Sequence, residues 1–341
     1  MNTLAIVILN YNGLQFLADF LPTVLANAEG HPVYVADSAS TDGSVAFVRQ
    51  TFPSVRLIEL ASNEGYAGGY NLALERVRTD YGGATYYVLL NSDIEVTPGW
   101  LSPVLGVMEA NPAIAACQPK IRSYAERRFF EHAGAAGGFV DWLGYVFCRG
   151  RIFATFEADA GQYNDNRRVF WATGACLFVR AEVFHQTGGF DASFFAHMEE
   201  IDWCWRIQRL GHEVWTCGES TVYHVGGGTL PKSNPHKTFL NYRNSLFMLY
   251  KNWPADGWLW GKLLLRLVLD GLSSLLFMKV GQWRDVGAII RAHFAFYGHL
   301  PQLRRQRNEL IARQTAKTDL YPHSIVWQYF GKGRKTFREV M

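Results

Sequence analysis

With 341 residues, the chain is long enough for one large α/β domain and an appendage, so core size is not limiting. Hydrophobic residues make up 49% and charged residues 18%, and the 11 Trp, 16 Tyr and 23 Phe suggest an aromatic-lined groove or a membrane surface. The five cysteines are odd in number, widely spaced and without a CxxC pair, which argues against a disulfide framework or a zinc site and favours a reducing cytoplasm.

The net charge of +3 is unevenly distributed along the chain. Residues 279–341 contain 12 Lys and Arg against 4 Asp and Glu, whereas residues 1–278 contain 21 against 26. This asymmetry suggests contact with an anionic phospholipid surface or with nucleic acid, or else a merely solvated tail. Because no nucleic-acid-binding motif accompanies the basic residues, we expect no nucleic-acid partner.

Strands and helices alternate in the first part of the chain. The apolar run 4–9 has no basic flank or cleavage site, so it predicts a buried first strand rather than a secretion signal. The elements expected after it are helix 14–28, strand 33–36, helix 45–50, strand 55–60, helix 69–77 and strand 86–90. Continuous apolar strands separated by amphipathic helices predict an α/β fold with a mostly parallel central sheet.

Four polar turns, 10–13, 37–44, 63–71 and 91–95, each follow a predicted strand. Such sheets bind ligands beyond the carboxyl ends of their strands, so we expect these turns to line one crevice. The turn 63–71 is rich in glycine, which would let its backbone approach a nucleotide, but it lacks Walker and dinucleotide-motif spacing. A simple tight turn is the alternative.

The remainder of the chain divides at about Pro235. Up to that point the pattern is less regular, with a predicted loop at 134–144 and a predicted strand at 176–179. Helical periodicity dominates 239–300. We therefore expect two units, an α/β domain at 1–235 and a helical, basic region at 236–341.

Two segments carry side chains suited to chemistry. Asp93 follows a buried strand, where it would either hold a divalent cation or merely cap a turn. His224 lies beside a glycine turn and would either complete the metal shell or have a structural role. Glu199 and Glu200 are adjacent, so they point in different directions on a helix. One carboxylate would accept a proton from an attacking hydroxyl, while the other would have a capping or orienting role. An acidic helix N-terminus stabilised by the helix dipole is the alternative.

Taken in order, these segments resemble the family 2 glycosyltransferases of the GT-A fold, and most nearly the rhamnosyltransferase-like branch used in surface polysaccharide assembly. The matching segments are 7–12, 35–44, 63–71, 90–93, 173–175, 189–191, 194–206 and 223–224. The resemblance covers roughly residues 1–235. It rests on the order and spacing of the segments, because no single motif would justify it.

The resemblance implies a set of site residues. The expected nucleotide-sugar-binding residues are Tyr11, Asn12, Asp37 at the base, Asn63, Gly65, Gly69, Asn71, Ser92 and Asp93. The expected acceptor or sugar pocket comprises Trp171, Gly174, Ala175 and His197. Asp93 and His224 would hold Mn²⁺ or Mg²⁺, while Asn91 replaces the first acid of the metal motif and Glu95 is a weaker candidate.

The implied reaction is a single displacement that inverts the anomeric configuration. Glu200 is the expected base, with Glu199 and Asp202 in reserve, although the family usually has Asp at this position. The donor would be a nucleotide-diphospho-sugar and the acceptor a glycan or lipid-linked glycan. Because the Gln-x-x-Arg-Trp motif of processive members and the membrane spans that follow it are missing from the sequence, we expect transfer of one or a few sugars.

Residues 258–278 predict an amphipathic helix lying in the plane of a membrane rather than a span, because Lys262, Arg266 and Asp270 recur every fourth residue. The flanking residues are Trp253, Trp258, Trp260 and Trp283, followed by the basic cluster 304–307. Packing on the catalytic domain or on a dimer partner is the alternative. We thus expect a cytoplasmic protein, peripheral on the inner face of the cell membrane and able to form homo-oligomers.

Two other functions are compatible with the sequence. With polyprenyl phosphate as acceptor, the enzyme would be a polyprenyl-phosphate sugar synthase, and the basic tail would suit that anionic nucleophile. A non-catalytic sugar-nucleotide-binding scaffold is the other, since Asn91 and Glu200 depart from the commonest acids of the family.

Overall fold

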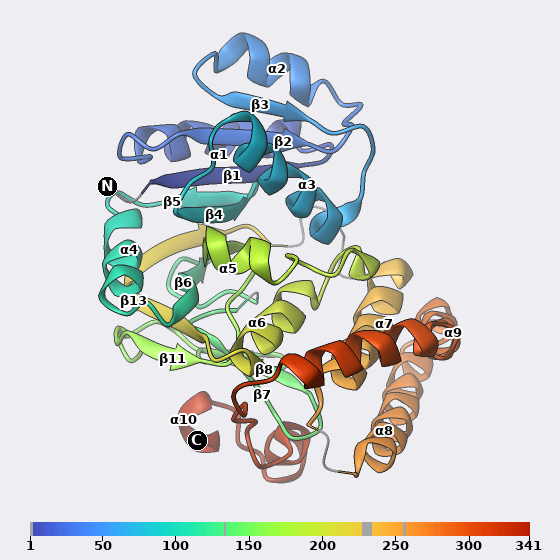
Figure 1. Cartoon of the computed structure of the whole chain (residues 1–341). Coiled ribbons are helices and arrows are strands. Elements are labelled where there is room, and N and C mark those ends of the chain that lie inside the picture. Colours follow the sequence, from blue (N-terminus) through green and yellow to red (C-terminus); the bar gives the residue numbers. More distant parts are fainter. Residues whose placement is uncertain (1–2, 133, 227–233, 255–256) are drawn as a thin grey trace.

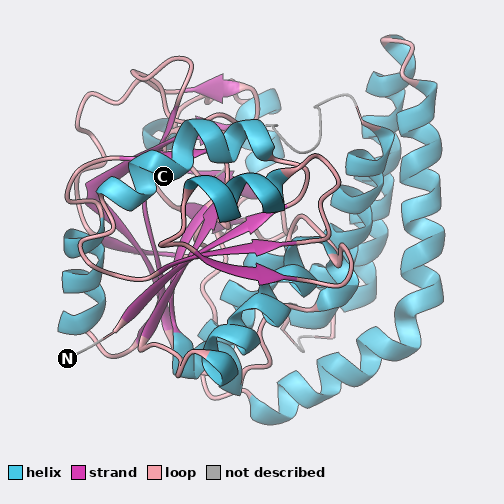
Figure 2. Ribbon diagram, turned by 90° about the horizontal axis from the view of Figure 1, so that it is seen from above, coloured by secondary structure: helices cyan, strands magenta, loops and turns pink. Residues whose placement is uncertain are grey.

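The computed structural model describes residues 3–132, 134–226, 234–254 and 257–341. A twisted, nine-stranded sheet lies at the centre with helices on both of its faces, and a group of long C-terminal helices stands beside it (Figures 1 and 2). The sheet is formed by β1 (Leu4–Asn10), β2 (Val33–Asp37), β3 (Arg56–Glu59), β4 (Tyr86–Asn91), β5 (Ile94–Val96), β6 (Ile114–Ser123), β11 (Arg167–Val169), β12 (Cys176–Arg180) and β13 (Glu213–His224). Its strand order is β11-β13-β6-β12-β4-β1-β2-β3, with β5 paired to β13.

The first four strands of the alternating region form the parallel part of the sheet. β1 pairs in parallel with β2 and β4, and β2 pairs in parallel with β3. The helices that connect them or flank the sheet are α1 (Leu14–Ala26), α2 (Ser44–Thr51), α3 (Gly65–Asp80), α4 (Leu101–Ala110) and α5 (Ala181–Gln186). Alternate side chains of β1 enter opposite cores, Val7 on one face and Ile6 and Ile8 on the other, which explains its continuous apolar sequence.

The rest of the sheet is mixed. β12 runs antiparallel to both β4 and β6, and β6 pairs in parallel with β13. A smaller four-stranded sheet has the order β10-β9-β8-β7 and is formed by β7 (Gly138–Val140), β8 (Val146–Cys148), β9 (Arg151–Ile152) and β10 (Thr155–Phe156). The segment 134–144, predicted to be a loop, therefore contains the strand β7. Packing requires glycine at the first residue of this strand, because a Cβ at Gly138 would lie 2.0 Å from the Trp171 ring.

The C-terminal part of the chain is helical, as expected, but it also returns to the small sheet. Two helices precede it, η1 (Ala192–Phe194) and α6 (Glu199–Arg209). Its own elements are α7 (Pro235–Asn252), α8 (Leu259–Lys279), α9 (Trp283–Arg313), η2 (Trp327–Gly331) and α10 (Phe337–Val340). α7 packs against α6 and α9. Residues after α9 lie beside β7, where the backbone N–H of Tyr321 donates to the carbonyl of Val140 at 2.8 Å.

The polar stripe of α8 faces the protein. Arg266, Asp270 and Ser274 are buried, whereas most of the leucines of this helix are exposed. The two arrangements expected for 258–278 are a helix in the plane of a membrane and a helix packed on protein. The polar face of α8 packs on protein, and no described residue covers its apolar face. No helix in the described ranges has the length and apolar character needed to cross a bilayer.

Candidate active site

The turns after β1 and β2 are tied together by side-chain hydrogen bonds. Asn10 Nδ2 donates to Asp37 Oδ2 at 2.8 Å, and the backbone N–H of Ser40 donates to Asp37 Oδ1 at 2.8 Å. Asn12 Oδ1 accepts from the backbone N–H of Thr41 at 2.8 Å. Both oxygens of the buried Asp37 are therefore engaged within the protein, while Tyr11 is exposed beside them.

The start of α3 adjoins the loop that precedes α6. Gly65, with φ of +69°, donates its N–H to Asn63 Oδ1 at 2.9 Å, and a Cβ at this glycine would lie 2.4 Å from the Phe195 carbonyl oxygen. Gly65 thus permits both the turn and the close approach. Its neighbour Ala67 donates its N–H to the same carbonyl at 3.1 Å.

Gly69 and Asn71, two of the expected nucleotide-binding residues, are engaged in packing. A Cβ at Gly69 would lie 2.9 Å from Leu9 Cδ2, so this glycine lets α3 approach β1. Asn71 bonds to both backbone groups of Phe190, donating to the carbonyl at 2.8 Å and accepting from the N–H at 3.0 Å. Gly69 and Asn71 therefore both make contacts within the protein.

Asp93, His224 and Glu131 form a buried cluster. His224 Nε2 lies 3.1 Å from Asp93 Oδ1, and its Nδ1 lies 3.0 Å from Glu131 Oε2. Pairing of β5 with β13 sets His224 opposite Ile94, next to Asp93. Burial lowers the pKa of His224, but the carboxylates of Asp93 and Glu131 outweigh it and raise that pKa to about 10.

The Asp93 and His224 pair has the spacing of two neighbouring metal ligands. Octahedral Mg²⁺ binds at about 2.1 Å, which places adjacent ligand atoms about 3 Å apart, close to the 3.1 Å between Oδ1 and Nε2. Glu131 contacts the other ring nitrogen and would orient the imidazole, as carboxylates commonly do behind a histidine ligand. Within the described ranges no three His, Cys, Asp or Glu side chains form a complete metal site. A cation here would therefore need oxygens from its substrate.

Glu199 and Glu200 open α6 after a backbone segment in an unusual conformation. Phe195, His197 and Met198 all have positive φ, of 63°, 71° and 72°. This tight path brings the two glutamates to the helix N-terminus beside Gly174. One carboxylate oxygen of each, Oε2, is buried and accepts no hydrogen bond from the described residues.

The two glutamates differ in acidity because their surroundings differ. Burial, reinforced by the charge of Glu200, raises the pKa of Glu199 well above its usual range. Burial also raises the pKa of Glu200, to about 7, but backbone hydrogen bonds from Ile201 and Gly174 oppose that rise. The two carboxyls titrate together, with Glu199 holding its proton more strongly than Glu200.

The segment 173–175 connects the glutamates to the Asp93 turn. Tyr66 Oη donates to the Gly174 carbonyl at 2.6 Å, and the Ala175 carbonyl accepts from the N–H of Asn91 at 2.9 Å. A Cβ at Gly174 would lie 2.5 Å from Tyr66 Oη, so only glycine fits. Ser92, half-buried in the Asp93 turn, completes this side of the site.

The other two expected pocket residues lie in different surroundings. Trp171 is buried against the small sheet and donates Nε1–H to the Phe139 carbonyl at 3.1 Å, so it is a core residue. His197 is half-buried next to Glu199, and burial with the nearby Lys237 lowers its pKa to about 4, leaving the ring neutral.

The charges of Glu200 and of Glu131 beside His224 both act on one buried thiol. Burial raises the pKa of Cys148 to about 12, and the charges of both Glu131 and Glu200 add to this rise. Glu131 and Glu200 are therefore within electrostatic reach of the same sulfur atom. Contacts link Glu200 to the Asp93 turn through the segment 173–175, since Gly174 hydrogen-bonds to Glu200 and the Ala175 carbonyl accepts from Asn91.

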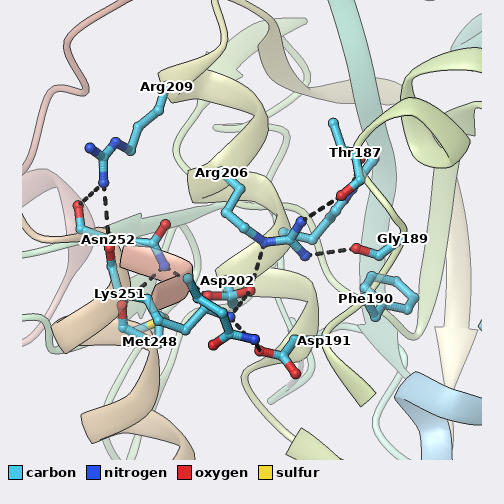
Figure 3. Close-up of polar contacts among 12 residues, drawn as sticks. Thr187, Gly189, Phe190, Asp191, Asp202, Arg206, Arg209, Met248, Lys251 and Asn252 are labelled. Carbon is cyan, nitrogen blue, oxygen red and sulfur yellow. Dashed lines mark hydrogen bonds and ion pairs between the residues drawn. The ribbon is translucent and has the colours of Figure 1, made fainter. Parts of the chain in front are cut away.

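Asp202, the reserve candidate for the base, takes part in a buried network that joins α6 to α7 (Figure 3). Its oxygens accept from Arg206 Nε at 2.8 Å, from Lys251 Nζ at 3.1 Å and from Asn252 Nδ2 at 2.7 Å. Lys251 Nζ also lies 2.6 Å from Asp191 Oδ2. Asp202 is fully buried and paired, so the geometry favours an anchoring role for it.

Two α7 residues hold the segment that carries the glutamates. The buried Asn244 places Nδ2 within 2.8–2.9 Å of the carbonyl oxygens of Phe194, Ala196 and His197. Arg243 donates to the Phe194 carbonyl at 3.0 Å. Sequence reasoning missed these residues and Glu131, since an isolated Asn, Arg or Glu outside a motif gives no local signal.

Comparison with known proteins gives one family match. The sequence profile described as "Glycosyl transferase family 2" matches residues 5–188, more than half of the chain. The chain is 27% identical over 292 residues to the "N-acetylglucosaminyl-diphospho-decaprenol L-rhamnosyltransferase" of Mycobacterium tuberculosis, covering 80% of this chain and 94% of the relative. It is 22% identical over 247 residues to the "Low-salt glycan biosynthesis hexosyltransferase Agl10" of Haloferax volcanii, covering 72% and 74%.

Solved structures share the fold at low sequence identity. The mannosyltransferase PcManGT from Pyrobaculum calidifontis, in complex with GDP-Man and Mn²⁺, superposes with a TM-score of 0.52 at 14% identity, covering 92% of this chain and 86% of that one. GalNAc-T7 with UDP, GalNAc and Mn²⁺ superposes with a TM-score of 0.58 at 14% identity, covering 75% of this chain. The chain spans 49% of the length of GalNAc-T7, about half. The GT-A fold is therefore shown.

Proposed function

Because the chain belongs to glycosyl transferase family 2, we propose that it transfers one sugar from a nucleotide-diphospho-sugar to an acceptor hydroxyl, with inversion at the anomeric carbon. The observation that carries the proposal is that Glu200, which has an unengaged carboxylate oxygen, is linked through the segment 173–175 to the turn of Asp93, which pairs with His224. A base and a cation site in one place are what such a transfer needs.

In this proposal Glu200 accepts the proton of the acceptor hydroxyl, whose oxygen attacks the anomeric carbon as the diphosphate leaves from the opposite side. The pKa of Glu200, raised to about 7, suits a base that works near neutrality. Glu199 beside it holds its proton more strongly than Glu200 does. Asn244 orients the backbone that carries both glutamates.

Asp93 and His224 would hold Mn²⁺ or Mg²⁺, with Glu131 orienting the imidazole. When bound, such a cation neutralises the negative charge that develops on the leaving diphosphate. The Mn²⁺ present with the two structural neighbours supports a divalent cation in this fold.

We propose that the donor lies along the turns after β1, β3 and β4. Exposure favours Tyr11 and Asn12 as contacts, and position in these turns favours the half-buried Asn63 and Ser92 and the buried Gly65. Asp37 would shape the base pocket together with the Asn10 side chain and the Ser40 backbone N–H, from which it accepts hydrogen bonds. Gly69 and Asn71 would act through packing rather than by touching the donor.

The acceptor is proposed to be a glycan or a lipid-linked glycan, reached at the inner face of the cell membrane. The name of the mycobacterial relative includes a decaprenol diphosphate, which supports a lipid-linked acceptor for this chain. Gly174, Ala175 and His197 are proposed to border its pocket beside Glu200. The division into a transferase domain at 1–235 and a helical region at 236–341 is part of the same proposal.

The test is a screen for donor hydrolysis and transfer with UDP-, GDP- and dTDP-sugars in the presence of Mn²⁺ or Mg²⁺. We expect one donor class to be turned over, EDTA to abolish turnover, and Asp93→Asn to abolish it as well. Glu131→Gln should weaken Mn²⁺ binding about 10- to 100-fold in calorimetry by loosening His224. Nucleotide binding without turnover would point to a non-catalytic scaffold, and a sugar-phosphate lipid product to polyprenyl phosphate as the acceptor.

A further inference from the structure

The helix α8 is inverted relative to an ordinary surface helix. Its exposed face, named here the outer face of α8, comprises Leu264, Leu265, Val268, Leu272, Leu275 and Leu276, each 40–64% exposed. The residues on the opposite side are Leu263, Arg266, Asp270 and Ser274, all buried. A soluble amphipathic helix buries its apolar side and exposes its charges, so α8 is oriented for a different solvent on its outside.

Specific contacts fix this orientation. Arg266 donates from Nε to Asp270 Oδ1 at 3.1 Å and from Nη2 to Ser245 Oγ at 2.8 Å, and its guanidinium lies 3.8 Å from the centre of the Tyr145 ring. Rotating α8 to hide its leucines would expose or strand this buried ion pair, which is costly. The outer face is therefore held outward by the polar interactions beneath it.

The exposed apolar surface continues on both sides of α8. Trp258, Trp260 and Trp283 at the helix ends are 60–69% exposed. On the side toward the C-terminus, a groove of about 400 Å³ is lined by the apolar side chains of Leu143, Leu265, Leu269, Val326, Trp327 and Phe330. Tryptophans at the rim of an aliphatic face are typical of the boundary between lipid headgroups and acyl chains.

The charges around the outer face have one sign. Between residues 257 and 295 the acidic side chains are Asp270 and Asp285, and both are buried. The exposed charged side chains of the same range are Lys279, Arg284 and Arg291. An anionic lipid leaflet supplies the opposite charge to these cations, whereas a second copy docking through the same face would present the same cations again.

We propose that the outer face of α8, with the flanking tryptophans, docks the protein on an anionic phospholipid bilayer. The leucines enter the headgroup and acyl boundary, and Lys279 and Arg284 contact lipid phosphates. The biological purpose rests on the proposed function, because docking brings the site to a lipid-linked acceptor. Binding to vesicles itself requires no sugar transfer.

The test is flotation of the full chain with vesicles of phosphatidylcholine alone and of phosphatidylcholine with phosphatidylglycerol. We expect flotation with the anionic vesicles, weakened by salt. The double variant Val268→Glu with Leu272→Glu should lower the partition coefficient at least tenfold. Lys279→Gln and Arg284→Gln should each lower it about fivefold. Leu72→Glu is the matched control, because Leu72 on α3 is 46% exposed but lies in the α/β part of the chain, and it should float like wild type.

Circular dichroism and donor turnover in solution establish that each variant is folded. The proposal is overturned if the wild-type protein stays at the bottom of the gradient with both vesicle types, or if the double variant floats as well as wild type. A wild-type dimer that the double variant dissociates in sedimentation, without any change in flotation, would assign the face to a second copy. A failed donor screen with intact flotation would overturn the proposed function alone.

Discussion

At the residue scale, adjacent Glu199 and Glu200 have different acidities because a helix N-terminus points neighbours in different directions. Glu199 is buried beside the charge of Glu200, whereas Glu200 receives backbone hydrogen bonds from Ile201 and Gly174. Glu200 is therefore the more readily ionised of the two carboxyls and the better candidate to accept a proton near neutrality.

This difference predicts opposite outcomes for two isosteric variants. Glu200→Gln should lower kcat about 100- to 10,000-fold with little change in donor affinity, because the amide cannot accept the proton. Glu199→Gln is the matched control and should keep most of the activity, since it replaces the carboxyl that holds its proton more strongly. Steady-state kinetics with a fixed acceptor measure both, and equal losses in the two variants would contradict the assignment of Glu200 as sole base.

The raised pKa of Glu200 also predicts the pH dependence. Only the ionised carboxylate accepts a proton, so kcat/KM should rise about tenfold per pH unit below about 7 and level off above it. The Glu199→Gln variant should show the same midpoint. A profile that falls through neutrality would mean that a protonated group, not Glu200, limits the reaction.

At the scale of elements, α6 depends on α7 for its charge balance. Asp202 on α6 and Asp191 before it share Lys251 of α7 (Figure 3). Burial alone would raise the pKa of Asp191, but Lys251 and the Ser193 hydrogen bonds hold it well below its usual range. The helix that carries the glutamates is thus positioned from outside the α/β unit.

Lys251→Met should therefore destabilise the protein by about 3–5 kcal/mol, because it leaves the buried Asp191 without its cation and Asp202 with the Arg206 cation alone. Arg49→Met removes a surface ion pair with Glu59, in which both side chains are more than half exposed, and should cost less than about 1 kcal/mol. Urea unfolding followed by circular dichroism compares the two. Similar small losses would show that the α6–α7 network contributes little.

At the scale of the whole molecule, the helical region is interlocked with the α/β part. Arg209 of α6 donates to the carbonyl of Asn252 at 3.1 Å and to Gln314 Oε1 at 2.5 Å. Trp205 Nε1 donates to Thr318 Oγ1 at 3.1 Å. These contacts join the proposed transferase domain to three separate places in the C-terminal region.

We expect a chain ending at residue 235 not to fold stably. It would remove Lys251 and Asn252 from Asp202, and it would remove the Asn252 and Gln314 partners of Arg209. Breaking a buried charge interaction costs about 3–5 kcal/mol, against a total stability of about 5–15 kcal/mol for an ordinary domain. Thermal unfolding and donor binding of residues 1–235 test this. A truncated chain that unfolds cooperatively and binds donor like the full chain would show that the two units are independent.

Much of the fold could be predicted from the sequence, because its signals are local. The alternation of strands and helices up to Asn91, the strand expected at 176–179 and the helical pattern expected from 239 follow from periodicity and turn residues. The structure extends the last two by a few residues, to β12 at Cys176–Arg180 and to the start of α7 at Pro235. The family resemblance is confirmed by the match over residues 5–188. The roles of the site residues stay predictions, although the structure brings Asp93 and His224 within 3.1 Å of each other.

Tertiary structure decided what depends on partners distant in sequence. Glu131 reaches His224 across 93 positions, and Asn244 and Lys251 act on a segment about 50 residues away, so no local pattern marks them. The spacing of Arg266 and Asp270 predicted an amphipathic helix but not which side would be buried. Periodicity defines two faces, and only the surroundings, here Ser245 and Tyr145, determine which face turns inward.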